Sequence, residues 1–235
     1  NYNPKTARLY EDFGLLTADP EICDDVASVF NSLTGSMPFG ECRRLLVAPA
    51  TMRQRFTELI RREAEHAQAG RPCGIRAKMN QLQDFEIIRE LYAASQAGVP
   101  IELNVRGLCC LRAGVPGMSD NIRVYGVVGR FLEHSRIYRF ENGGTPEFYI
   151  GSADWMRRNL DARMETIMPV LDERIQAELE HFLDVYDEDN ITAWDMQPDG
   201  TYVKRSPASG SSTVIMPIVV PGRGFSSTRS RETVS

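Results

Sequence analysis

The fold is decided by residues 75–105, IRAKMNQLQDFEIIRELYAASQAGVPIELNV. Strand-like runs at 75–79 and 100–105 flank a segment whose apolar side chains recur at helical spacing. Two strands joined through a helix by short loops pair in parallel within one sheet. A strand-like run at 45–48 and an amphipathic segment at 52–67 repeat this pattern upstream. The sequence therefore predicts three parallel strands with two crossover helices.

Further elements extend this pattern in both directions. We expect strands near 122–128, 136–140, 147–150 and 163–170, and a last amphipathic helix from Asp172 to Tyr186. Upstream, residues 8–17 indicate an extended segment. Asp19-Pro20 is typical of a helix start, and that helix should end at Gly35. The expected fold class is α/β, with a mixed sheet flanked by helices.

Composition divides the chain into three parts, which we expect at 1–42, 43–194 and 195–235. Gly and Pro punctuate residues 34–42, which indicates a linker. The last part is rich in Ser and Thr and is typical of a flexible tail. Its apolar run at 214–220 contains a Pro, which favours an edge strand over a central one.

Bulk composition excludes several classes of protein. The 235 residues are 42% hydrophobic and 25% charged, which is typical of a globular protein, and no apolar run is long enough to span a membrane. A net charge of -5 argues against a nucleic-acid binder. Five cysteines without ligand spacing argue against a zinc site and a disulfide scaffold, and favour the cytoplasm. An N-terminus without Met or an apolar segment indicates a cut chain.

The basic residues are mostly of one kind. Of 27 basic residues 24 are Arg, and ten of these lie between Arg106 and Arg174, where there is no Lys. The planar guanidinium binds phosphate in a bidentate manner that Lys cannot match. Codon bias in a GC-rich genome is an alternative explanation of the overall ratio.

Three histidines are candidates for acid–base or nucleophilic chemistry. His66 and His181 lie in charged helical segments, and we expect both to be solvated. His134 directly precedes a predicted strand, and Arg136 lies on the same face because side chains alternate along a strand. A guanidinium can neutralise phosphate charge while the imidazole acts as acid, base or nucleophile. The alternative is a structural His134 bonded to a glutamate nearby in sequence.

The residues around His134 resemble a motif of the phospholipase D superfamily, His-x-Lys followed by Asp and then by Gly-Ser-x-Asn. Here His134-Ser135-Arg136, Glu141 and Gly151-Ser152-Ala153-Asp154 occupy these positions. The resemblance implies a phospholipase D-like fold and the second half of a two-motif site. Arg for Lys, Glu for Asp and Asp for Asn are departures that favour a phosphate pocket over phosphodiesterase chemistry.

Longer segments resemble bacterial polyphosphate kinase of the first type, over roughly residues 1–190. These segments are 3–10, 104–111, 119–123, 131–136, 141–144 and 152–159. The resemblance implies reversible transfer of the terminal phosphate of ATP to inorganic polyphosphate through a phosphohistidine. It places the nucleophilic His and the Mg²⁺ ligands upstream of this chain. The chain would then hold the end of one phospholipase D-like half and all of the other, and be inactive alone.

The resemblance also assigns roles to three residues. Tyr10, Arg106 and His134 match nucleotide-binding positions, and His134 matches a second essential His. A Tyr ring can stack on adenine, and an Arg at a strand end can hold a phosphate. His134 can protonate a leaving phosphate oxygen. The alternatives are a core Tyr10 and a surface ion pair for Arg106. Candidates to line a polyphosphate path are Arg123, Arg136, Arg157 and Arg158.

The implied partners are ATP or ADP and inorganic polyphosphate. The resemblance implies a homo-oligomeric cytoplasmic enzyme and is compatible with peripheral attachment to a membrane. Two other functions stay open. One is a phospholipase D-like phosphodiesterase or nuclease, which Arg136 and the negative net charge disfavour. The other is a non-catalytic module for polyanion binding or oligomerisation.

Overall fold

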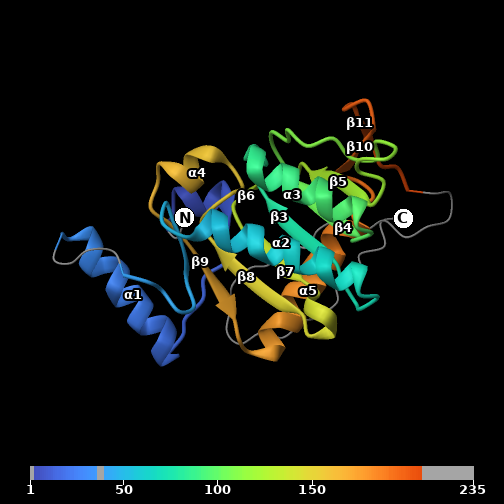
Figure 1. Cartoon of the computed structure of the whole chain (residues 1–235). Coiled ribbons are helices and arrows are strands. Elements are labelled where there is room, and N and C mark those ends of the chain that lie inside the picture. Colours follow the sequence, from blue (N-terminus) through green and yellow to red (C-terminus); the bar gives the residue numbers. More distant parts are fainter. Residues whose placement is uncertain (1–2, 36–39, 208–235) are drawn as a thin grey trace.

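The computed structural model describes residues 3–35 and 40–207 (Figure 1). Nine strands form one large sheet: β2 (Leu46–Ala48), β3 (Ile75–Met79), β4 (Ile101–Val105), β5 (Ile122–Val127), β7 (Ile137–Phe140), β8 (Glu147–Gly151), β9 (Glu165–Val170), β10 (Ala193–Met196) and β11 (Tyr202–Lys204). Two further strands form a small parallel sheet: β1 (Tyr10–Glu11) and β6 (Leu132–Glu133). The helices are α1 (Pro20–Leu33), α2 (Met52–Gln68), α3 (Phe85–Gln96), α4 (Arg157–Asp161) and α5 (Glu173–Glu188), with 3-10 turns η1 (Thr6–Arg8) and η2 (Asn142–Gly144).

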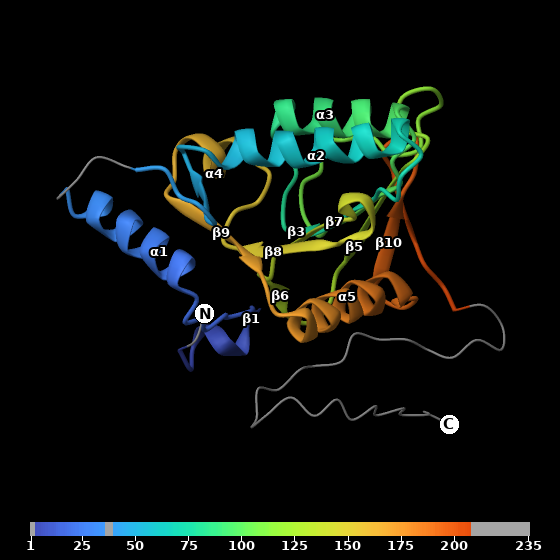
Figure 2. The ribbon, with the colours of Figure 1, turned by 60° about the horizontal axis from the view of Figure 1, so that its bottom comes forward.

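The large sheet is mixed and has the strand order β11-β10-β5-β4-β3-β7-β8-β9-β2. Strands β3, β4 and β5 are parallel, as the sequence predicts for 75–79 and 100–105. Strands β7, β8 and β9 continue the sheet beyond β3 in antiparallel order. Helices α2 and α3 cover one face and α5 covers the other (Figure 2). The expected α/β class, a mixed sheet between helices, is confirmed.

The first strand of the predicted parallel set lies elsewhere. β2 forms the far edge of the sheet, antiparallel to β9 and separated from β3 by β7, β8 and β9. The 17 residues of α2 explain this. At about 1.5 Å per residue the helix spans about 25 Å, enough to cross several strands spaced about 4.8 Å apart. The predicted succession of strand, helix and strand is therefore confirmed. The expectation that β2 lies beside β3 in the parallel set is wrong.

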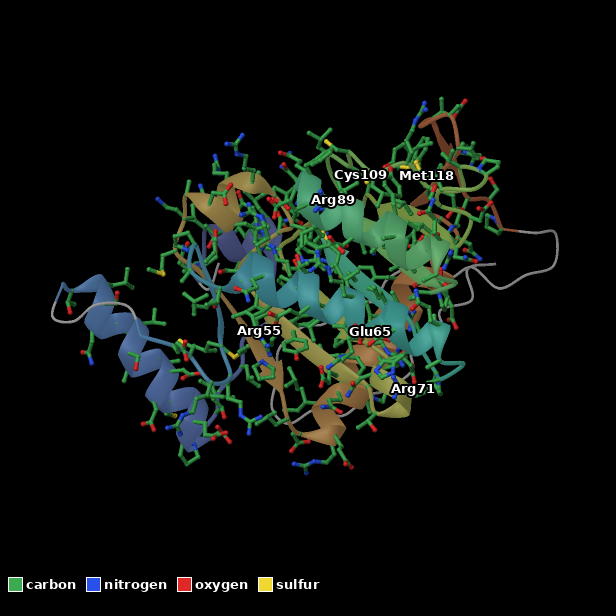
Figure 3. The ribbon with its side chains drawn as sticks, in the orientation of Figure 1. Arg55, Glu65, Arg71, Arg89, Cys109 and Met118 are labelled. Carbon is green, nitrogen blue, oxygen red and sulfur yellow. The ribbon has the colours of Figure 1, made fainter. Side chains whose placement is uncertain are left out.

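The two faces of the sheet differ in chemistry. Along β3, Ile75, Ala77 and Met79 enter the main apolar core beneath α2 and α3. The outer sides of those helices carry charged residues such as Arg55, Glu65 and Arg89 (Figure 3). Arg76 points to the opposite face, where its Nη1 lies 2.7 Å from carboxylate oxygens of Glu180 and Asp184 in α5. Helix α5 is therefore held by ion pairs as well as by apolar contacts.

Residues upstream of α1 are less regular than the expected extended segment at 8–17. They form η1 and the two-residue strand β1, followed by irregular backbone. The predicted start and end of α1 are confirmed. The Asp19 side chain accepts a hydrogen bond from the Ile22 N–H at 3.0 Å, and Gly35 follows the helix with φ at 73°.

Two further expectations need correction. The sheet continues through β10 and β11 to Lys204, so residues 195–204 do not belong to a tail. The remainder of the predicted tail, including 214–220, lies outside the described residues.

The two helical histidines differ in exposure. His181 is exposed as predicted, but His66 is buried. The His66 ring packs under Gly143, where an added Cβ atom would lie 3.2 Å from Cε1. The five cysteines are free.

No helix among residues 3–35 and 40–207 combines the length and the apolar character that crossing a membrane requires.

A buried carboxylate joins α1 to the large sheet. Asp25 is 4% exposed, and it accepts hydrogen bonds from three successive N–H groups at 43–45, with distances of 3.0, 2.6 and 2.9 Å. Without it these donors would lose their partners. We expect Asp25→Ala to lower the free energy of unfolding by about 1–3 kcal/mol, because the buried Leu45 N–H is left without a partner and an unsatisfied buried group costs about that much. Urea unfolding followed by circular dichroism measures this.

The neighbouring Asp24 is exposed and provides the matched control. Asp24→Ala should change the free energy of unfolding by less than about 0.5 kcal/mol. Equal stabilities for the two variants would show that the Asp25 carboxylate does not anchor α1.

Candidate functional site

Several strand ends meet at one edge of the large sheet. The carboxyl ends of the parallel strands β3 and β4 lie there. Because β7 is antiparallel to β3 and to β8, the beginning of β7 and the end of β8 lie at this edge too. Asn80 and Arg106 follow β3 and β4, Arg136 precedes β7, and Asp154 follows β8. The topology alone thus gathers an amide, a carboxylate and two guanidinium groups.

Asp154 links these groups. Its side chain is buried, and Oδ1 accepts hydrogen bonds from the Asn80 backbone N–H at 2.9 Å and from Arg136 Nε at 3.0 Å. The Asn80 side chain in turn accepts two hydrogen bonds from Arg106, from Nε at 3.3 Å and Nη2 at 3.2 Å. Two cationic side chains are therefore held by one connected set of hydrogen bonds. Fixed guanidinium groups of this kind can bind an anion with little loss of entropy.

His134 joins this set through the backbone and through a ring contact. Arg136 Nη1 donates a hydrogen bond to the His134 carbonyl oxygen. The imidazole packs against the ring of Tyr10, with centroids 4.7 Å apart and planes at 79°. The structure therefore brings together Tyr10, Arg106, His134 and Arg136, which the sequence singled out separately.

The small sheet places Tyr10 beside His134. Strand β1 pairs in parallel with β6, with Tyr10 opposite Leu132. The Leu132 N–H donates to the Leu9 carbonyl at 2.7 Å, and the His134 N–H donates to the Glu11 carbonyl at 2.6 Å. These two hydrogen bonds fix the register in which the two rings meet. The N-terminal segment thus completes the site by adding a strand.

The pKa of His134 is lowered from its ordinary value of 6.5. Burial contributes most, and the positive charges of Arg136 and Arg106 lower the pKa further, while Asp12 and Asp154 oppose them. The imidazole is therefore neutral near pH 7 and can accept a proton. The two glutamates near it in sequence have other partners: Glu133 faces Lys78 at 3.6 Å, and Glu141 pairs with Arg139 at 2.6 Å.

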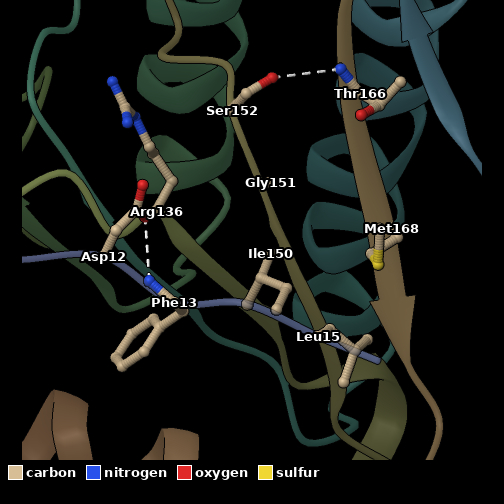
Figure 4. Close-up of a pocket in the computed structure, with 9 residues that line it drawn as sticks. All are labelled: Asp12, Phe13, Leu15, Arg136, Ile150, Gly151, Ser152, Thr166 and Met168. Atoms are coloured by element: carbon tan, nitrogen blue, oxygen red, sulfur yellow. Dashed lines mark hydrogen bonds between the residues drawn. The ribbon is translucent and has the colours of Figure 1, made fainter. Parts of the chain in front are cut away.

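A hollow of about 250 Å³ adjoins Arg136 (Figure 4). Asp12 lies beside Arg136, and apolar side chains of the N-terminal segment and of the sheet form the opposite wall. The lining residues are Asp12, Phe13, Leu15, Arg136, Ile150, Gly151, Ser152, Thr166 and Met168. A cationic end and an apolar wall suit a ligand that has both anionic and apolar parts.

The other candidate arginines differ in position. Arg123 lies near the start of β5, at the opposite end of the parallel strands, where it pairs with Glu102 at 2.8 Å and with Asp187. It lines a separate hollow there. Arg157 and Arg158 are exposed on α4, which follows the Asp154 segment. The structure thus places Arg123 and Arg136 at opposite ends of the parallel strands. This arrangement does not support a single polyphosphate path lined by both side chains.

No cluster of three or more His, Cys, Asp and Glu side chains among the described residues is arranged to hold a metal ion. Two acidic side chains near the site pair with cationic groups: Asp154 with Arg136, and Glu133 with Lys78. Magnesium, with ligands from outside this chain, stays a prediction.

Sequence reasoning missed Asn80 and Lys78. Asn80 directly follows β3 just as Arg106 follows β4, so the rule that ligands gather at the carboxyl ends of parallel strands would have found it. Lys78 is buried within β3, with 1% of its surface exposed. Its signal was a lone Lys inside a strand-like run, in a chain where nearly every other basic residue is Arg.

Known proteins resemble this chain over most of its length. A family model described as polyphosphate kinase C-terminal domain 2 matches residues 45–214, and one described as C-terminal domain 1 matches residues 1–38. The polyphosphate kinase of Thermosynechococcus vestitus is 57% identical over 212 residues, which cover 90% of this chain and 29% of that protein. The polyphosphate kinase of Pseudomonas aeruginosa is 49% identical over 212 residues, which cover 90% of this chain and 31% of that protein.

A solved structure extends this similarity to three dimensions. The crystal structure of polyphosphate kinase from Porphyromonas gingivalis matches with a TM-score of 0.86 and 43% identity. The match covers 92% of this chain and 33% of that one. This chain therefore spans about a third of the length of the proteins it matches.

The charges around His134 give a testable titration. We expect its imidazole to titrate below pH 6.5, and Arg136→Gln to raise its pKa because a nearby positive charge is removed. Since the unfolded chain would bind this proton first, the free energy of unfolding should fall as the pH drops through 6.5. Proton NMR of the imidazole signals measures the pKa directly.

Arg130 is exposed and provides the control. It is not among the charges that shift His134, so Arg130→Gln should leave the titration unchanged. Two results would contradict the placement of His134 in a buried cationic site: an imidazole pKa at or above 6.5, or a pKa that does not change in Arg136→Gln.

Proposed function

Because the chain belongs to the polyphosphate kinase family, we propose that it is the C-terminal part of an enzyme that transfers the terminal phosphate of ATP reversibly to inorganic polyphosphate. The observation that carries this proposal is the convergence of Tyr10, Arg106, His134 and Arg136 at one edge of the sheet. The chain spans about a third of the length of its relatives. The proposal includes further active-site residues outside the chain. We call the protein that carries this chain as its C-terminal part the full-length enzyme.

The two guanidinium groups are suited to hold the phosphates. Arg106 uses Nε and Nη2 to bond Asn80, and we assign Nη1 to a phosphate oxygen of the nucleotide. Arg136 is fixed by Asp154 and lines the hollow in Figure 4. Such preorganised cations stabilise the charge that develops on a phosphoryl group during transfer. Tyr10 offers a ring face for the adenine.

His134 is suited to move a proton at the phosphate that leaves or attacks. Burial and the adjacent guanidinium groups lower its pKa, so the neutral imidazole prevails near pH 7 and the protonated form is a stronger acid than usual. We assign to the protonated minor form donation of its proton to the leaving phosphate oxygen, which leaves the imidazole neutral, and to the neutral form removal of a proton from the attacking phosphate oxygen in the reverse direction. The phosphohistidine intermediate forms on a His outside this chain. Magnesium, held outside this chain, would neutralise phosphate charge when bound.

The proton-transfer role of His134 predicts a loss of turnover without a loss of stability. In the full-length enzyme His134→Ala should lower kcat by about 10²–10⁴-fold, the usual range for a positioned acid or base. His134→Gln should restore little, because an amide forms hydrogen bonds but transfers no proton. Turnover with γ-labelled ATP and thermal melting are measured on the same samples.

His181→Ala is the matched control, since that imidazole is exposed on α5. It should keep the rate of the unmodified enzyme. A His134→Ala variant with normal turnover and a lowered melting temperature would make His134 a structural residue.

Loss of the Arg106 guanidinium should affect ATP binding and chemistry together. We expect Arg106→Ala to raise the apparent KM for ATP and to lower kcat, because a charge-assisted bond to phosphate contributes about 1.5–3 kcal/mol. Steady-state kinetics at varied ATP concentration measure both constants. Arg89→Ala, on the outer side of α3, is the control (Figure 3). Unchanged constants in a folded Arg106→Ala enzyme would leave Arg106 a structural partner of Asn80.

A further inference from the structure

A buried ammonium group lies directly behind His134. Lys78, in the middle of β3, is 1% exposed. Its Nζ donates hydrogen bonds to the carbonyl oxygen and to Oγ of Ser135, both at 2.8 Å. The Glu133 carboxylate lies 3.6 Å away, and the ring of Tyr186 from α5 lies beneath at 5.1 Å. The Lys78 ammonium thus contacts two residues of the segment that carries His134.

The segment from Glu133 to Ile137 alternates between the interior and the site. Glu133, Ser135 and Ile137 are buried, whereas His134 and Arg136 are half-buried. Ile137 is the register partner of Lys78 in the sheet. By contacting the inward residues, Lys78 fixes the direction in which the outward residues project. It does so without lining the hollow beside Arg136.

The Lys78 charge also acts on two carboxylates from distant parts of the chain, Glu133 at 3.6 Å and Glu11. Strands β1 and β6 pair so that Glu11 stands directly opposite Glu133. Like charges in this position repel and destabilise a strand pair. Burial raises the pKa of Glu11, with Glu133 acting in the same direction, and Lys78 opposes the shift. A positive charge on Lys78 offsets this repulsion, and the two carboxylates in turn oppose the lowering of the Lys78 pKa by burial.

The register of this strand pair sets the geometry of the site. Tyr10 precedes Glu11 in β1, and His134 follows Glu133. The hydrogen bond from the His134 N–H to the Glu11 carbonyl and the ring contact between Tyr10 and His134 both depend on it. If β1 separated from β6, the Tyr10 ring would leave the imidazole.

We propose that Lys78 is a positioning residue that couples the two segments of the site. By neutralising Glu11 and Glu133 and bonding Ser135, it holds Tyr10 against His134 and directs His134 and Arg136 outward. Lys78 touches no substrate in this arrangement and acts through the residues it holds. The consequence for turnover rests on the proposed function, whereas the consequence for the Tyr10–His134 contact does not.

The first experiment measures that contact in the 235-residue chain by NMR. The Tyr10 ring current shifts the His134 imidazole signals, and Tyr10→Leu gives the value without the ring. Lys78→Met should move the signals toward the Tyr10→Leu value. A triple variant, Lys78→Met with Glu11→Gln and Glu133→Gln, removes the repulsion and should move them back. Unchanged signals in Lys78→Met would overturn the proposal.

The second experiment measures kinetics in the full-length enzyme. Lys78→Met should raise the KM for ATP and lower kcat, each by about tenfold or more, because both Tyr10 and the His134 segment lose their positions. The triple variant should recover at least several-fold of kcat/KM over Lys78→Met. Lys204→Met is the control, since Lys204 is exposed at the sheet edge and should keep both constants.

The outcomes separate the two proposals. A lowered melting temperature with unchanged KM and kcat, or a triple variant no better than Lys78→Met, would reduce Lys78 to a structural residue. If Lys78→Met does not fold, the triple variant, whose buried cluster is uncharged, is measured instead. His134 signals close to those of the unmodified chain would support the proposal, and signals at the Tyr10→Leu value would contradict it. If the full-length enzyme makes no polyphosphate, the proposed function fails, while the NMR result still decides the role of Lys78.

Discussion

The site depends on one carboxylate oxygen, Oδ1 of Asp154. It accepts hydrogen bonds from the backbone after β3 and from the side chain before β7, and it belongs to the loop after β8. Three strand ends are thereby joined at one atom. Asp154 holds Asn80, and the Asn80 side chain accepts the hydrogen bonds of Arg106. Asp154 also holds Arg136, which donates a hydrogen bond to the His134 carbonyl oxygen. The Asp154 N–H is itself bonded to the Asn159 side chain at 3.4 Å, which ties the loop to α4.

The parts of the fold that were predictable are those set by local periodicity. The runs at 75–79 and 100–105 pair in parallel as expected, since a helix with short loops leaves few other arrangements. The position of β2 was not predictable, because strand order depends on contacts with β9, which lies far away in sequence. Strands β10 and β11 were missed because strands of three or four residues are too short to show a periodicity that distinguishes them from loops.

The site shows the same division between local and distant information. His134, Arg136 and Asp154 were found because a motif records their spacing. Glu141 matches the spacing but lies at the other end of β7, paired with Arg139, so spacing alone does not place a side chain in a site. Lys78 was missed because a buried charge is recognised only from its partners, and those come from separate segments of the chain. The burial of His66 was missed because the Gly143 turn that covers its ring comes from a distant part of the chain.

The brevity of strand β1 has a consequence for how the site behaves in time. Only two residues of β1 pair with β6, so few backbone hydrogen bonds oppose its separation from the rest of the protein. Segments with so little pairing open with a small free energy, far below that of global unfolding. A molecule that contacts Tyr10 and His134 together binds only the closed form, and it therefore shifts this equilibrium in proportion to its concentration over its dissociation constant. Amide hydrogen exchange at Leu132 and His134 would then slow as ligand is added. The exchange rates of these two backbone amides therefore report how much of the site is occupied.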